Sequence, residues 1–180
     1  MKTIYVWNNS DLISLKDFPA YVFHNRTLLH NKYFIPLVKE RKTRFDYDDV
    51  NKIIVAAKQY PDQRTVHVIL LSPYDSLPGV DQDELFHTCS VLIEQLQSAR
   101  NLHLLILKFF PLPKEYSSQV PKLIRFQNRL RQFVRGRSNV TVQDHHSVSQ
   151  TTLNLEFPAR QHWVEQFYRD IIIQVSNLNF

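Results

Sequence analysis

Apolar runs alternate along the chain with segments in which apolar residues recur every three or four positions. A run that is nearly all apolar is typical of a strand buried on both faces of a parallel sheet. Two such runs, 65–71 (TVHVILL) and 102–110 (LHLLILKFF), are predicted as the central strands. Pro36 interrupts the run 31–38 (NKYFIPLV), which predicts a strand at the edge of the sheet. Shorter strands are predicted at 3–7 (TIYVW) and 139–143 (NVTVQ).

The segments with helical spacing predict four amphipathic helices. They are 46–60, 81–99, 120–136 and 159–175. The apolar stripe of the first is Val50, Ile53, Ile54 and Ala57. That of the second is Leu85, Cys89, Leu92, Ile93 and Leu96. The third has Val120, Leu123, Gln127, Leu130 and Val134 on its inward face, and Gly136 is expected to end it.

Strands that alternate with helices in this way predict an α/β fold. We expect a single three-layer domain over residues 1–180, with a central, mainly parallel sheet of about five strands. No repeat, linker or low-complexity segment divides the chain.

Composition narrows the class of protein. The 180 residues are 43% hydrophobic, which is enough to bury a sizeable core. The one cysteine, Cys89, favours a reducing compartment because no disulfide can form within the chain. The first residues do not resemble a signal peptide, and no apolar run is long enough to span a membrane. A cytoplasmic protein is therefore expected.

Charge is unevenly distributed along the sequence. The formal net charge is +5. Basic residues collect at 39–44 (KERKTR) and from Pro121 to Arg137, where no acidic residue interrupts them. Acidic residues collect at 46–49 and 81–84. A long run of one sign favours an anionic partner over a merely solvated helix face.

On the predicted helix 120–136, Lys122, Arg125 and Arg129 follow one another at helical spacing opposite the apolar stripe, while Arg131 and Arg135 flank it. Arginine binds phosphates through two hydrogen bonds and stacks on exposed bases, which favours RNA. This face lacks large apolar residues at its centre, which disfavours a membrane surface. The predicted phosphate contacts are Lys122, Arg125, Arg129, Arg135 and Arg137, with Arg26, Lys39, Arg41, Lys42 and Arg160 as secondary candidates.

Other candidate chemistry is sparse. No glycine-rich phosphate loop of either common type occurs, and no cysteine or histidine spacing suits zinc, so no cofactor or metal is expected. The run Asp144, His145 and His146 offers a metal ligand or a base, although a solvated loop is the favoured interpretation. Ser10 follows the first predicted strand, where α/β enzymes often place a nucleophile.

The order of these elements resembles that of the SGNH (GDSL-type) hydrolases. Ser10 in VWNNSDL lies where that family has its catalytic serine, and TLNLEFPARQHW lies where the family has a late Asp-x-x-His before the last helix. The motifs themselves depart from the family. Asn8 and Asn9 replace the glycine and aspartate before the serine, and the late histidine would fall at Asn154 or Leu155. Serine needs a base to become nucleophilic, so Ser10 is interpreted as a turn residue and no enzymatic activity is expected.

A degenerate SGNH-like domain with a basic surface is similar to the OSK domains of the Oskar proteins, the insect germ-plasm organisers. The similarity lies in RFQNRLRQFVRGR, in the closing LNLEFPARQHWVEQFYRDIIIQV and in the absent triad. It implies a non-enzymatic domain that recruits mRNA, through 3′ untranslated regions, into cytoplasmic ribonucleoprotein granules of the germ plasm, where granule proteins are further partners.

Two alternatives stay open. The first is an active esterase that uses Ser10 with His145 or His146 as its base. The second is a protein–protein scaffold whose basic surface meets an acidic partner.

Overall fold

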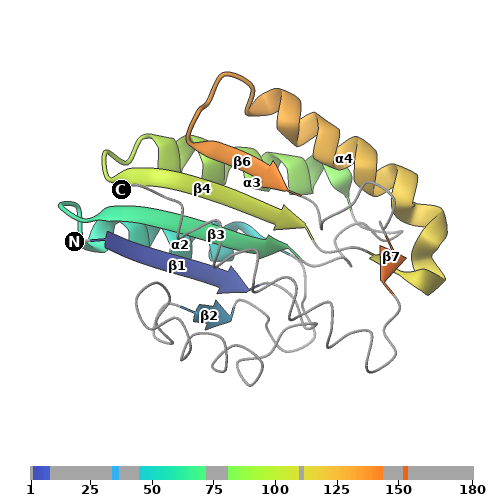
Figure 1. Ribbon diagram of the computed structural model, residues 1–180, viewed down its shortest axis with the longest axis horizontal. Coiled ribbons are helices and arrows are strands. Elements are labelled where there is room, and N and C mark those ends of the chain that lie inside the picture. The colour runs from blue at the N-terminus through green and yellow to red at the C-terminus, as the bar shows by residue number, and fades with distance from the viewer. Residues whose placement is uncertain are drawn as a thin grey trace.

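The computed structural model describes residues 2–8, 34–36, 45–71, 81–109, 112–143 and 152–153. Its main sheet is parallel throughout. The strands are β1 (Lys2–Asn8), β2 (Phe34–Pro36), β3 (Arg64–Leu71), β4 (Leu102–Phe109) and β6 (Val140–Gln143). They lie in the order β2-β1-β3-β4-β6, with the three-residue β2 at one edge (Figure 1). The α/β class and the parallel sheet predicted from the sequence are confirmed, and β3 and β4 are interior strands.

Within the described residues, three α-helices connect these strands: α2 (Tyr47–Gln59), α3 (Gln82–Gln97) and α4 (Val120–Phe133). Aspartates begin the first two. At α2, Asp46 and Asp49 each accept a hydrogen bond of 3.1 Å from the other's backbone N–H, which is a capping box. At α3, Asp81 Oδ1 accepts from the N–H groups of Asp83 and Glu84 at 3.0 and 3.2 Å. These caps satisfy backbone donors that have no partner within the helix.

The side chains on one face of the sheet form a core with all three helices. The register places Trp7 beside Ile69, Ile69 beside Leu107 and Leu107 beside Val142, so this row crosses four strands. Against it pack the stripes predicted for α2 and α3, all of whose residues are buried. On α4 the buried residues are Leu123, Phe126, Gln127 and Leu130, followed by Val134.

The opposite face of the sheet is buried as well. Val6, Val68 and Ile106, which alternate with the first row, are at most 2% exposed. Both faces of the central strands are therefore shielded from water. This agrees with the largely apolar runs from which these strands are predicted.

Some elements differ from the sequence prediction. The segments interpreted as loops contain a 3₁₀ helix, η3 (Lys114–Gln119), and two short strands, β5 (Leu112–Pro113) and β7 (Thr152–Leu153), which pair in parallel. Two-residue strands have no periodicity to detect. Helix α4 ends at Phe133, and Gly136 follows in the left-handed region at φ 84°. The predicted last helix, 159–175, lies outside the described residues.

The buried rows lead to a prediction about stability. Ile69 and Leu105 are fully buried on adjacent interior strands, so Ile69→Ala or Leu105→Ala should lower the free energy of unfolding by about 2–5 kcal/mol. Val55 on α2 is 70% exposed, and Val55→Ala should change it by less than about 0.5 kcal/mol. Urea denaturation compares the three variants. Core variants that unfold at the parent's urea concentration would show that this strand placement is wrong.

Candidate nucleic-acid interface

Helix α4 separates its apolar and basic residues onto two sides. Its buried side packs on the sheet and on α3, and no residue of Val120–Phe133 is acidic. Arg125 and Arg129 lie on the exposed side, and Arg135 is exposed just past the end of the helix. The outward direction predicted for Arg125 and Arg129 is thus observed, whereas Lys122, predicted on the same face, is half-buried. Arg135, predicted at the edge of the apolar stripe, is exposed.

Three of the side chains predicted to contact phosphates have no charged partner within the described residues. Within the described part of the chain, Lys122, Arg125 and Arg135 form no ion pair and no side-chain hydrogen bond. Arg131 differs, because it is half-buried and its Nη1 donates to Asn128 Oδ1 at 3.2 Å. The free cations of this region are therefore spread along the outer side of α4.

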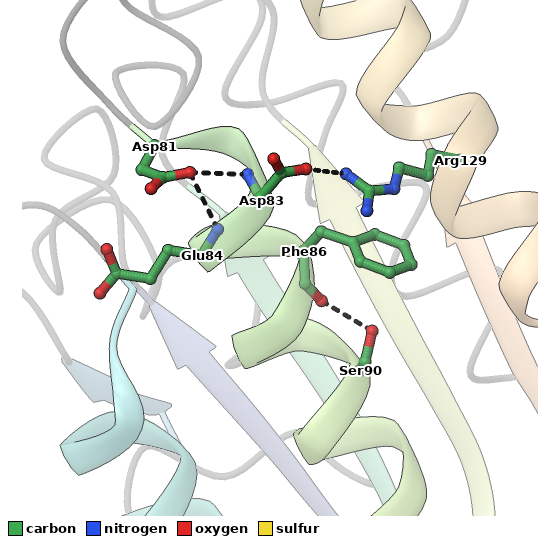
Figure 2. Close-up of polar contacts among 6 residues, drawn as sticks. All are labelled: Asp81, Asp83, Glu84, Phe86, Ser90 and Arg129. Atoms are coloured by element: carbon green, nitrogen blue, oxygen red, sulfur yellow. Dashed lines mark hydrogen bonds and ion pairs between the residues drawn. The ribbon is translucent and has the colours of Figure 1, made fainter.

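Arg129 reaches across to α3. Its Nη1 lies 2.6 Å from Asp83 Oδ1, and the guanidinium carbon lies 3.8 Å from the centre of the Phe86 ring. Figure 2 shows the guanidinium extending from α4 toward Asp83, with the aromatic ring of Phe86 close to it. The ion pair and the cation–π contact together tie the second half of α4 to the first turns of α3.

Arg137, four residues beyond the end of α4, makes a similar set of contacts with the later part of α3. Its Nη2 lies 2.6 Å from Glu94 Oε1, its Nη1 donates to Gln97 Oε1, and its guanidinium carbon lies 4.9 Å from the centre of the Phe133 ring. The left-handed turn at Gly136 comes directly before it and ends the helical path.

We call these residues the α3–α4 seam: Asp83, Phe86, Glu94 and Gln97 from α3, with Arg129, Phe133 and Arg137. Phe86 and Phe133 meet edge to face at its centre, with ring centres 5.7 Å apart. Two arginines predicted to contact phosphates are thus engaged within the fold. The partners of these two arginines were not predicted from the sequence. A signal for them exists, because Asp83, Phe86 and Glu94 are spaced so that they share one face of α3, and Arg129, Phe133 and Arg137 follow one another every four residues.

The remaining sequence candidates lie outside the described residues. These are Arg26, Lys39, Arg41, Lys42 and Arg160 among the basic residues, and Ser10, Asp144, His145 and His146 among the candidates for chemistry. The strand order reverses between β1 and β3, and open α/β sheets bind ligands beyond the carboxyl ends of strands at such a point. Ser10 follows the end of β1 by two residues.

One described histidine has a strongly perturbed pKa. Burial lowers the pKa of His67 from 6.5 to about 3 because the charged imidazolium would lose its hydration. Trp7 Nε1 donates to His67 Nδ1 at 3.1 Å, so the neutral ring carries its proton on Nε2. Tyr5, its neighbour on β1, stacks on the ring with centres 4.9 Å apart. Completely buried among aromatic side chains, His67 belongs to the core and is closed to a substrate.

The described residues contain no group of three metal-ligating side chains close enough to hold an ion. Among the helices described here, none combines the length and the apolar character needed to cross a lipid bilayer. No protein-family model and no curated protein matches this sequence.

The seam leads to a prediction about stability. Arg137→Gln removes an ion pair and a cation–π contact and should lower the free energy of unfolding by about 1–2 kcal/mol. Arg135→Gln removes the same charge from an exposed side chain without such contacts, and should change it by less than about 0.5 kcal/mol. Urea denaturation at one salt concentration compares the two. Equal effects would mean that Arg137 does not hold α4 on α3.

His67 leads to a prediction about acid stability. Unfolded His67 binds a proton near pH 6.5, whereas the folded residue resists protonation down to about pH 3. The stability that depends on neutral His67 is therefore complete above pH 6.5 and falls below it, by up to about 1.4 kcal/mol per pH unit. His67→Gln keeps an acceptor for Trp7 and should remove this part of the slope in urea denaturation between pH 7 and 4. The control is His87→Gln, because the side chain of His87 on α3 is exposed. A slope unchanged in His67→Gln would contradict the argument.

Proposed function

We propose that this chain is a non-enzymatic RNA-binding domain that contacts RNA phosphates through the outer side of α4. The observation that carries the proposal is the set of free cations there. Lys122, Arg125 and Arg135 lie on or next to a helix without acidic residues and have no charged partner among the described residues. Cations without internal partners are available to neutralise phosphates.

The resemblance to OSK domains favours RNA over other polyanions, and mRNA recruitment into cytoplasmic germ-plasm granules rests on that resemblance alone. The strand order and the packing of α2, α3 and α4 on one face of the sheet are compatible with a three-layer, SGNH-like domain. Such a domain would carry the RNA surface on the helix that follows β4.

The absence of catalysis is part of the same proposal. The sequence replaces the glycine and aspartate that precede the family's serine with Asn8 and Asn9, and it lacks the late histidine. His67, the described histidine with a perturbed pKa, is enclosed in the core and cannot act as a base toward a substrate. Ser10 then has the role of a turn residue.

The test is the salt dependence of RNA binding. Fluorescence anisotropy with a labelled single-stranded RNA should give an affinity that falls steeply between about 50 and 200 mM salt. In Arg125→Gln/Arg135→Gln the affinity should fall, and the slope of log K against log salt should shrink by about 1.4, because each lost phosphate contact contributes about 0.7. The matched control is Lys52→Gln/Lys58→Gln, which removes two exposed charges from α2.

The control separates a local interface from general attraction. Both double variants have the same net charge, so a local interface predicts a much larger loss for the α4 variant. Equal losses would place the RNA elsewhere. Binding that is flat with salt would contradict phosphate contact and favour the scaffold alternative.

A further inference from the structure

The guanidinium of Arg129 has one occupied face and one occupied edge. Phe86 lies 3.8 Å from it and covers one face, while Asp83 holds Nη1 at 2.6 Å (Figure 2). The side chain nevertheless stays 47% exposed. Within the described residues, no hydrogen bond, ion pair or ring contact engages the face of the guanidinium that points away from Phe86.

We propose that an unpaired RNA base stacks on this outer face, giving a base–Arg129–Phe86 sandwich. The proposal rests on the function proposed above and adds a base-binding subsite to it. Arginine guanidinium planes and aromatic rings are the platforms on which proteins stack unpaired bases. Here Phe86 and Asp83 already fix the orientation of the plane, so less freedom is lost when a base binds.

The charges around Arg129 favour a base over a phosphate. Asp83 neutralises the guanidinium, and its own side chain is 85% exposed, so a phosphate at this position would meet a nearby carboxylate. A neutral, flat ligand meets no such repulsion. Arg125 lies one helical turn before Arg129, about 5–6 Å away between Cβ atoms, and has its charge free for a phosphate of the same strand.

Arg137 provides an internal comparison. It also lies over a phenylalanine and pairs with a glutamate, but it additionally donates to Gln97 and is only 25% exposed. Little of its plane is open, so it should hold α4 on α3 without binding a base. Substitution by lysine should therefore affect base binding at Arg129 but not at Arg137.

The experiment compares two strands of equal length and phosphate number: a single-stranded oligoadenylate and the corresponding abasic ribose-phosphate strand. The wild-type protein should bind the strand with bases more tightly, by about fivefold or more. Arg129→Lys keeps the positive charge beside Asp83 but removes the plane, so the ratio of the two affinities should fall toward one. Arg137→Lys is the matched control and should leave the ratio as in the wild type.

A spectroscopic readout accompanies the affinities. A strand that carries 2-aminopurine should lose fluorescence on binding to the wild type and to Arg137→Lys, but less on binding to Arg129→Lys. Thermal melting should show that both variants are folded. An unchanged ratio in Arg129→Lys, or an equal fall in both variants, would overturn the stacking site. Wild-type protein that binds both strands equally and with a steep salt dependence would also overturn it, while the proposed phosphate interface would stand. Wild-type protein that binds neither strand would overturn both.

Discussion

The burial of both faces of the parallel sheet is the constraint on which the rest of this structure depends. Each helix that covers the sheet must turn its apolar stripe toward it, and on α4 the buried residues are Leu123, Phe126 and Leu130, with the polar Gln127 among them. Because a helix repeats every 3.6 residues, fixing these four positions also fixes which residues face water and which face the neighbouring helix. Arg125 is thereby placed on the solvent side and Arg129 beside α3.

The packing of α4 beside α3 also reduces the positive charge that the basic run exposes. Along the sequence, acidic 81–84 and basic Pro121–Arg137 are separate runs, and each suggests an uncompensated surface. In the fold, α3 and α4 lie side by side, and two acids of α3 neutralise two arginines of the basic run. The electrostatic surface that remains for a partner is smaller than the sequence suggests, and it lies on the outer side of α4.

How much the sequence predicts depends on how local the cause is. The long strands and the stripes of α2 and α3 were predicted because periodicity and apolar runs come from the pattern of neighbouring residues. The acidic partners of Arg129 and Arg137 were not predicted, because they are more than 40 residues away along the chain and their contacts depend on how two helices align. The β5–β7 pair was missed for a similar reason. Its strands have two residues each and exist only through their pairing with each other.

The contacts of His67 in the core are a further case that the local sequence pattern does not predict. The run TVHVILL predicted a buried strand, and a histidine within it is unfavourable unless it stays neutral and is hydrogen-bonded. On β1, Tyr5 lies beside His67, and Trp7, two residues further on, donates to Nδ1, whereas the protonated Nε2 has no hydrogen-bond partner within the described residues. The hydrogen bond of His67 Nδ1 thus depends on one aromatic residue, Trp7, of the neighbouring strand.

Arginine, rather than lysine, at 129 and 137 gives α4 its double role. A planar group can lie against an aromatic ring with one face and bind a carboxylate with an edge, which a lysine ammonium cannot do. At Arg137 these contacts and Gln97 leave little of the group exposed, so the residue serves the fold. At Arg129 the same contacts leave one face toward water, so a residue that stabilises the packing of α4 can also present a surface to a ligand. The stability of the seam and the proposed recognition of RNA are therefore linked through a single side chain, and only a substitution that keeps the ion pair while removing the plane can separate the two.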